Sequence, residues 1–309
     1  MDCFVLGTGG MMPMPYRFLT SLAVRMAGSI YLFDAGEGTQ IPYKKLHLGL
    51  RSLRVISISH LHADHVLGLP GLLMLRGQMP EPEKLVILGP PGLARFIRNV
   101  RKDLAMHIQY PIEVRQYDRN DPTTVAYEDE NLTLSWHPLD HSVFCLGYRL
   151  VEHERPGKFD LESAQNLGVP PGPLFGKLQQ GEAVTLPSGE VIQAEQVVGD
   201  KRRGRRVAYI TDTQITPKMQ PILKEADLAF IETMFLEEHA EDAAAKKHMT
   251  AGQAAKAATE AQVEKLRLFH FSPRYEGKDI RRFTEEASEF HNNVKASREG
   301  EEIAVPLPE

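Results

Sequence analysis

The segment His60-Leu61-His62-Ala63-Asp64-His65 places four side chains that commonly bind metal ions within six residues. An apolar run at residues 53–58 precedes it and is rich in the β-branched residues that favour strands. A second apolar run at residues 66–75 follows it and is more typical of a helix. The six residues therefore lie where a buried strand is predicted to end and a loop leads into a helix.

The side chains of this segment suggest the kind of ion that it would bind. Imidazole and carboxylate groups together suit zinc or a similar divalent ion. His60 and His62 are two positions apart in an extended segment, so their side chains point the same way and can hold one metal ion. Asp64 and His65 follow at the turn, where they can face a second ion. The alternative is a polar loop in which histidines cluster by chance, and four ligand types in six residues argue against it.

Potential ligands also follow three later predicted strands. Residues 206–211, 228–231 and 266–269 are predicted strands, and they precede, respectively, Asp212, Glu232 and His270. Open sheets place their chemistry at the carboxyl ends of strands. A single Asp or His there is usually a turn residue, but the recurrence predicts that Asp212 and His270 share metal ions with the cluster at 60–65.

Two histidines lie close together before the predicted strand at residues 143–151, namely His137 and His141. Either could be the next metal ligand. We favour His141, because it lies at the start of that strand, and keep His137 as the competing candidate.

Asp34 follows the predicted strand at residues 29–33 and lies beside glycines. Histidines that bind metals need their second ring nitrogen held by another group. Asp34 is therefore either a brace for the metal-binding loop or a cap for a helix that begins near Thr39, and the sequence does not separate these two roles.

His248 precedes an alanine-rich helix predicted at residues 251–262, whose start is marked by the capping-box pair Thr250 and Gln253. A helix N-terminus attracts anions through its free amides and its dipole. His248 could therefore contact a phosphate or a leaving oxygen, and the alternative is a histidine that only extends the cap.

Composition limits the class of protein. The chain has 309 residues, a net charge of −5, 42% hydrophobic and 25% charged residues, as expected for a soluble globular protein. Cys3 and Cys145 are the only cysteines, which predicts no disulfide framework and a reducing, cytoplasmic location. The N-terminus lacks the pattern of a signal peptide. No apolar run reaches the ~18 residues that a membrane span needs.

Residues 152–200 are dense in proline and glycine and lack long apolar periodicity. We expect such an insertion to build no core of its own and to be functional or mobile. It ends at the basic run of residues 201–206, which is either a solvated turn or a contact for a polyanion. The polar tail after residue 293 is expected to be loose.

Several of these motifs resemble a known family. Residues 60–65 resemble the signature of the metallo-β-lactamase superfamily. Within it, residues 59–73 (SHLHADHVLGLPGLL), 32–40 (LFDAGEGTQ) and 270–275 (HFSPRY) resemble the ribonuclease Z branch, which processes the 3′ ends of tRNA. Residues 168–182 (GVPPGPLFGKLQQGE) resemble the arm with which that branch holds tRNA. The resemblance covers nearly the whole chain.

The resemblance implies an α/β fold, a metallo-β-lactamase-type αβ/βα four-layer sandwich with a protruding flexible arm. Residues 1–309 would form a single metallo-hydrolase domain, and residues 152–200 would be the inserted substrate-binding arm. Two zinc ions per chain are implied, although manganese accepts similar ligands. The first ion would be held by His60, His62 and His141. The second would be held by Asp64, His65 and His270, with Asp212 bridging the two.

The resemblance also implies roles in the reaction and a set of partners. Asp64 would orient or deprotonate water, His248 would protonate the leaving 3′ oxygen, and Glu232 would orient His248. The substrate would be precursor tRNA, bound by a cytoplasmic homodimer. RNA contacts are expected from Lys177, Lys201, Arg202, Arg203 and Arg274.

Two alternatives remain open at this stage. One is a phosphodiesterase, thioesterase or lactonase for small molecules that uses the same metal site, although such an enzyme has little use for the arm. The other is an RNA-binding module with structural metals. Structural zinc sites are typically closed and rich in cysteine, which disfavours this second alternative.

Overall fold

A computed structural model describes residues 1–308, and the chain forms two compact units. The larger unit contains Met1–Val151 and Arg206–Pro306, and the smaller contains Glu152–Arg205 together with the C-terminal residues from Leu307. Each unit has its own hydrophobic core, and each is described by itself.

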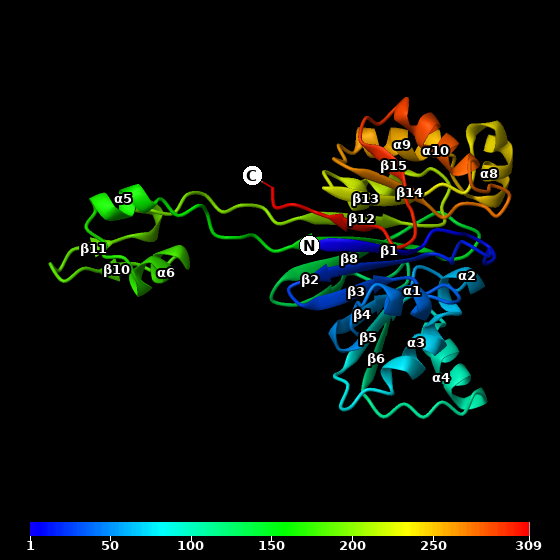
Figure 1. Cartoon of the computed structure of the whole chain (residues 1–309), viewed down its shortest axis with the longest axis horizontal. Coiled ribbons are helices and arrows are strands. Elements are labelled where there is room, and N and C mark those ends of the chain that lie inside the picture. The colour runs from blue at the N-terminus through cyan, green and yellow to red at the C-terminus, as the bar shows by residue number, and fades with distance from the viewer. Residues whose placement is uncertain (309) are drawn as a thin grey trace. The chain divides into compact units, whose positions relative to one another are not determined.

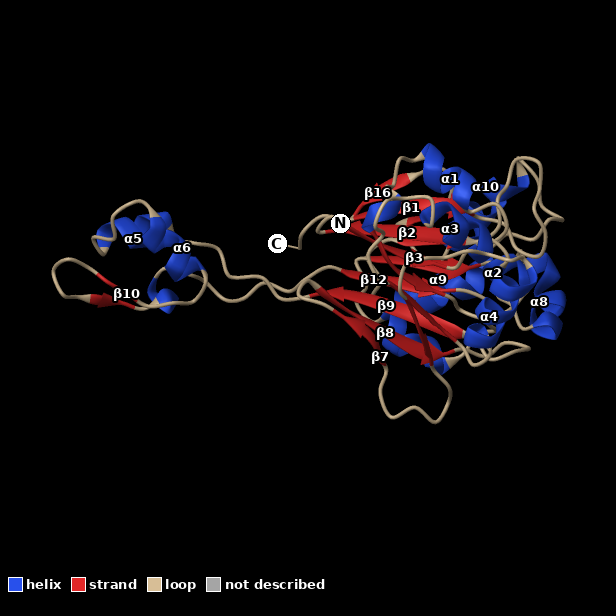
Figure 2. Ribbon diagram, turned by 90° about the horizontal axis from the view of Figure 1, so that it is seen from below, coloured by secondary structure: helices blue, strands red, loops and turns tan. Residues whose placement is uncertain are grey.

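Two seven-stranded sheets lie at the centre of the larger unit (Figures 1 and 2). The first sheet has the order β16 (Glu302–Ala304), β1 (Asp2–Gly7), β2 (Ser21–Met26), β3 (Ser29–Phe33), β4 (Leu53–Ser57), β5 (Leu85–Gly89) and β6 (Ile112–Gln116). The second has the order β15 (Val294–Ala296), β14 (Leu266–Phe269), β13 (Leu228–Glu232), β12 (Arg206–Ile210), β9 (Leu146–Glu152), β8 (Leu132–Pro138) and β7 (Val125–Glu128). Strands β3 to β6 are parallel, as are β12 to β15. Loops after neighbouring parallel strands therefore emerge at the same edge of each sheet.

Helices cover the outer faces of both sheets (Figure 1). Beside the first sheet are α1 (Gln40–Lys45), α2 (Ala63–Val66), α3 (Leu69–Arg76) and α4 (Leu93–Asp103). Beside the second are α7 (Gln220–Leu223), α9 (Ala251–Glu260) and α10 (Asp279–Ser288). Helix α8 (Ala240–Lys246) and the short 3-10 turns η1 (Leu50–Ser52), η3 (Pro217–Met219) and η4 (Glu237–His239) complete the unit. Among the described residues, no helix combines the length and the apolar character that crossing a bilayer would need.

The alternation of side chains along β3 shows how the layers are held together. Ile30 and Leu32 belong to the core between the first sheet and its helices, whereas Tyr31 and Phe33 belong to the core between the two sheets. Successive residues of a strand point to opposite faces, so a strand that is apolar throughout is buried on both sides. The four-layer α/β sandwich expected from the sequence is confirmed.

The smaller unit contains α5 (Leu161–Asn166), α6 (Pro173–Gln179), the hairpin of β10 (Val184–Thr185) and β11 (Val191–Ile192), and the turn η2 (Ala194–Gln196). Buried apolar residues from these short elements pack together; among them are Ala164, Leu178, Val184, Ile192 and Val197. The expectation that this insertion builds no core was wrong, because its turns bring widely spaced apolar residues into contact.

The expectation of a loose tail after residue 293 was also wrong. Strand β15 pairs in parallel with β14, and β16 pairs antiparallel with β1. Both strands have only three residues, which is too short for an apolar pattern. Their hydrogen bonds to neighbouring strands place them in the sheets.

Candidate metal centre and active site

Polar side chains that follow strands of both sheets each lie within ion-pair or hydrogen-bond distance of another polar side chain of this site. In the first sheet they come from the ends of β3 and β4, and in the second from the ends of β12, β13 and β14. These side chains are Asp34, His60, Asp212, Glu232 and His270.

Asp212 lies between two groups of histidines. Its Oδ2 atom is 3.6 Å from Nε2 of His60 and 3.6 Å from Nε2 of His141. Its Oδ1 atom is 3.2 Å from Nε2 of His65 and 3.1 Å from Nε2 of His270. Each carboxylate oxygen thus faces a different group, which is the geometry of a bridging ligand.

The motif at residues 60–65 completes both groups. Nδ1 of His62 is 2.9 Å from Nε2 of His60. Oδ2 of Asp64 is 3.5 Å from Nε2 of both His65 and His270. The ligand atoms of His60, His62, His141 and Asp212 lie within 4.8 Å of one another, as do those of Asp64, His65 and His270.

His141 shows that these donors suit a cation. Its Nδ1 atom is 3.1 Å from the carbonyl oxygen of Lys247, which can only accept, so Nδ1 holds the proton and Nε2 a lone pair. Among the described residues this buried Nε2 has no hydrogen-bond partner. A lone pair that faces the carboxylate of Asp212 is unfavourable unless a cation lies between them. Imidazole and carboxylate ligands without sulfur suit a divalent metal ion such as zinc or manganese.

The carboxylates of Asp212 and Asp64 give the candidate metal centre negative charge. Burial opposes the ionisation of Asp212, but His270, His65 and His60 hold its pKa well below the usual range. Burial likewise opposes the ionisation of Asp64, and the neighbouring His65 and His270 lower its pKa. Both carboxylates therefore remain charged throughout the neutral range.

Asp34 holds the motif in place. It is fully buried, and its Oδ1 atom accepts the backbone N–H of Ser59 at 2.7 Å. Its Oδ2 atom is 2.8 Å from the Ser59 hydroxyl, from Nδ1 of His65 and from the Tyr209 hydroxyl. A buried carboxylate that orients a ligating histidine fixes its ring and tautomer. The bracing role is confirmed, and the capping role is wrong, since the N-cap of α1 is Thr39 and no side chain caps the amides of that helix.

His248 lies beside the centre and is held by Glu232. Nδ1 of His248 is 2.9 Å from Oε1 of Glu232, whose two oxygens also accept the backbone N–H groups of Thr213 and Met234 at 3.0 Å. Burial lowers the pKa of His248, but the Glu232 carboxylate outweighs it and raises that pKa to about 9. The predicted capping box of Thr250 is present. His248 therefore holds a proton at neutral pH with Nε2 turned away from Glu232.

Comparison with known proteins places this chain in a family. A family model described as "Beta-lactamase superfamily domain" matches residues 149–271, and one described as "Anti-Pycsar protein Apyc1" matches residues 1–112. A ribonuclease Z of Lactiplantibacillus plantarum is 35% identical and covers 98% of each chain. A ribonuclease Z of Treponema denticola is 44% identical over 289 residues, which cover 94% of this chain and 93% of that one.

The chain belongs to the ribonuclease Z family. A crystal structure of the short form of human tRNase Z has the same fold, with a TM-score of 0.71 and 23% sequence identity. The likeness covers 99% of this chain and 100% of that one. The fold of this chain is therefore the metallo-β-lactamase fold that is found in tRNase Z.

His137, the competing candidate, does not join the metal centre of this ribonuclease Z family member. It lies within β8, next to Trp136, which is buried between the sheets. The groups of described side chains that could hold a metal ion include His141 and omit His137. The loop between β8 and β9 lets His141 reach the edge where the other ligands gather.

The predicted RNA contacts lie outside the metal centre. Lys177 lies in α6, and the basic run at 201–206 follows η2. Two arginines of that run are paired with acids, Arg205 with Glu152 at 2.6 Å and Arg206 with Glu225 at 2.6 Å. Nε of Arg202 donates to the Pro156 carbonyl, and Lys201 and Arg203 are exposed. Arg274 contacts Asp242 at 2.9 Å. Their binding of RNA stays a prediction.

Two contributors to the site were missed in the sequence. The backbone N–H of Met11 donates to Oδ2 of Asp64 at 2.6 Å, and the Tyr209 hydroxyl donates to Asp34. Tyr209 occupies a strand position that reads as ordinary core. Met11 follows three glycines, Gly7, Gly9 and Gly10, and this pattern does not reveal a contact with Asp64.

Replacing Asp34 with alanine should weaken the binding of zinc ions by about 10–100-fold, the usual loss when a partner of a ligating histidine is removed. The buried carboxylate is the acceptor for four groups, so its loss frees the ring of His65 and the backbone at Ser59. Titration of the metal-free protein with zinc measures the effect. Tyr209→Phe removes one of the four bonds and should cost much less; equal losses in both variants would contradict the bracing role.

Proposed function

We propose that the protein is an endoribonuclease that removes the 3′ trailer from precursor tRNA. The products are a tRNA with a free 3′-hydroxyl and a trailer with a 5′-phosphate. The observation that supports this most is the Asp212-bridged pair of ligand groups beside the Glu232–His248 pair. It occurs in a chain that is 44% identical to a ribonuclease Z over 94% of its length.

The resident metals in this proposal are two zinc ions per chain. One group, His60, His62 and His141, would hold the first ion, and Asp64, His65 and His270 would hold the second, with Asp212 shared. When bound, such a pair lowers the pKa of water and neutralises the charge that develops on a phosphate.

The protein's own side chains would position and move the protons. Asp64 is charged, and the backbone N–H of Met11 fixes one of its oxygens, so its carboxylate can accept a hydrogen bond from the attacking water and orient it. Glu232 holds Nδ1 of His248, so Nε2 is the atom that would give its proton to the leaving 3′ oxygen of the tRNA. The pKa near 9 keeps that proton available at neutral pH.

The deciding experiment is incubation of the purified, zinc-loaded protein with a 3′-extended precursor tRNA, followed by mapping of the cut and of its chemical ends. A single cut at the 3′ end of the tRNA, abolished by a chelator, supports the proposal. Hydrolysis of small phosphodiesters without any cut in precursor tRNA would instead indicate the small-molecule phosphodiesterase.

The insertion, residues 152–200, would be the arm that grips the tRNA. A polyanion requires local positive charge on a chain of net charge −5. The side chains that would supply it are Lys177, Lys201, Arg202 and Arg203, with Arg274 on the larger unit.

Deleting residues 154–203, which include most of this insertion and the start of the basic run, should raise KM for precursor tRNA strongly and leave hydrolysis of bis(p-nitrophenyl) phosphate intact. The backbone N–H of Glu152 donates to the carbonyl of Arg205 at 2.9 Å beside the antiparallel pair β9 and β12, so an Asn-Gly turn can replace residues 154–203 and preserve that pair. The salt dependence of tRNA binding should also weaken, by ~0.7–0.9 log units per log unit of salt for each phosphate that the shortened protein no longer binds. Equal damage to both substrates would make the insertion a structural element, and no effect on either would contradict the arm.

In the same proposal the protein is a cytoplasmic homodimer, and each arm serves the active site of the partner subunit. Mixed dimers of the arm-deleted protein and His248→Ala test this. Each variant is defective by itself. In a mixed dimer, the His248→Ala subunit supplies an intact arm and the arm-deleted subunit supplies an intact active site. Recovery of precursor tRNA cleavage supports the arrangement, whereas no recovery in dimers verified by sedimentation would show that each arm serves its own subunit.

A further inference from the structure

The two members of the Glu232–His248 pair come from different segments of the chain. Glu232 is the last residue of β13, and His248 precedes α9. The segments that follow them run side by side, because the N–H of Phe235 bonds the carbonyl of Met249 at 3.3 Å and the N–H of Ala251 bonds the carbonyl of Phe235 at 3.1 Å. The distance between Glu232 and His248 therefore depends on the register of these two segments.

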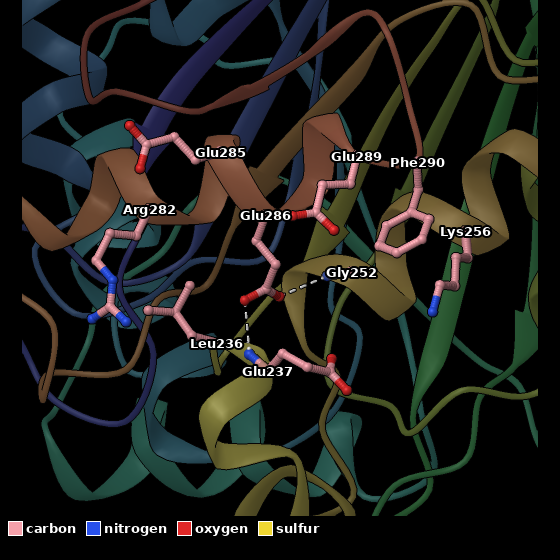
Figure 3. Close-up of a pocket in the computed structure, with 9 residues that line it drawn as sticks. All are labelled: Leu236, Glu237, Gly252, Lys256, Arg282, Glu285, Glu286, Glu289 and Phe290. Carbon is pink, nitrogen blue, oxygen red and sulfur yellow. Dashed lines mark hydrogen bonds between the residues drawn. The ribbon is translucent and has the colours of Figure 1, made fainter.

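One carboxylate binds both segments at the end away from this pair. Oε2 of Glu286 accepts the backbone N–H of Glu237 at 2.8 Å, and Oε1 accepts the backbone N–H of Gly252 at 2.9 Å (Figure 3). Glu237 adds a cross-link, since its Oε2 accepts the hydroxyl of Thr250 at 2.7 Å. Hydrogen bonds to a charged carboxylate are shorter and stronger than neutral ones.

Helix α10 holds Glu286 firmly in this place. Phe283 and Ala287, on either side of it in sequence, are fully buried against the core that α9 also joins. Gly252 is the second residue of α9, so the carboxylate also faces the positive end of that helix. Glu289 lines the same pocket, but the hydrogen bonds drawn there are accepted by Glu286 (Figure 3).

We propose that Glu286 is a positioning residue for His248, which it holds at the reacting bond by fixing the register of residues 232–237 against residues 248–252. The inference rests on the proposed role of His248 as proton donor. A displacement of about 1 Å at a reacting group can cost 10²-fold in rate. Glu286 can therefore affect the rate of cleavage strongly, although it is not a metal ligand.

Glu286→Ala and Glu286→Gln test the inference in the full-length, zinc-loaded protein. We expect kcat for precursor tRNA to fall by about 10–100-fold in the alanine variant, with KM nearly unchanged. Glu286→Gln retains one acceptor oxygen and should lose less. Hydrolysis of bis(p-nitrophenyl) phosphate should be nearly unchanged, because p-nitrophenolate leaves without a proton. Glu289→Gln is the matched control, from the same pocket, and should behave as the unchanged protein.

The split between the two substrates separates positioning from a general structural role. Equal loss on both substrates, or loss of zinc, in both Glu286 variants would overturn the inference, and so would a normal kcat for precursor tRNA. If the alanine variant fails to fold, the glutamine variant gives the same comparison. Failure of the unchanged protein to cut precursor tRNA would overturn the proposed function itself, and with it this inference.

Discussion

Asp212→Ala should abolish cleavage and bring the zinc content from about two ions per chain to fewer than one. The two oxygens of Asp212 face different groups of histidines, at 3.6 Å on one side and 3.1–3.2 Å on the other. Removal of this carboxylate therefore weakens both ligand groups and leaves a buried set of imidazoles without their shared anion. The loss of zinc affinity should exceed the roughly 100-fold that removal of an outer partner can cause.

Zinc content by elemental analysis and zinc affinity by titration measure this effect. Asp227→Asn is a suitable control, because Asp227 is also buried and accepts the backbone N–H of Arg206 at 2.7 Å, but does not belong to either ligand group. Asp212→Ala protein that keeps one ion at full affinity would show that Asp212 serves a single ion. One ion per chain in the fully loaded parent protein would contradict the dinuclear proposal.

His248→Ala should retain both ions and bind precursor tRNA normally, yet cleave it about 10²–10⁴-fold more slowly, as expected for loss of a general acid. The 3′ oxygen of a ribose is a poor leaving group and needs a proton, so the loss should appear in kcat. Bis(p-nitrophenyl) phosphate should be hydrolysed at nearly the parental rate. Single-turnover cleavage with saturating protein gives the rate of the chemical step.

The pH profile provides an independent check on His248. The Glu232 carboxylate raises the pKa of His248, so the proton is present below the raised value and is lost as the pH rises through it. The parent protein should therefore show a falling basic limb, which Glu232→Gln moves to lower pH and His248→Ala removes. The control is His239→Ala, since His239 is a half-buried histidine on η4 and belongs to neither ligand group, and this variant should leave the profile unchanged. Loss of zinc in His248→Ala would instead make this residue a metal ligand.

Much of the site could be predicted from the sequence, because the ends of strands can be recognised in it. An apolar run that stops at a polar residue predicts both a strand and the edge where its last side chain lies, and Asp212 and His270 follow β12 and β14 in this way. The choice between His137 and His141 depended on where the strand β8 ends, and spacing alone left it open. Tyr209 and Glu286 could not be predicted, because their partners are brought to them by tertiary packing.

The two wrong predictions about the fold, a loose tail and an insertion without a core, have a common physical origin. A pattern within one segment does not reveal very short elements, because the strands and apolar residues that they contact stabilise them. Val294–Ala296 lacks a pattern of its own and becomes a strand at the edge of β14. In the insertion, Leu178 and Ile192 are too far apart for a periodic signal, yet both are buried in one cluster.

The strands β15 and β16 affect the order in which parts of the chain can fold during translation. β15 borders the second sheet and β16 the first, so the few residues between them connect one sheet to the other. Synthesis proceeds from the N-terminus, so one edge of β1 stays unpaired until residues 302–304 have been translated. An unpaired strand edge is a template for pairing with another chain. Nascent chains therefore carry this unpaired edge while all the residues between the two strands are being made, and the edge is protected only when β16 pairs with β1.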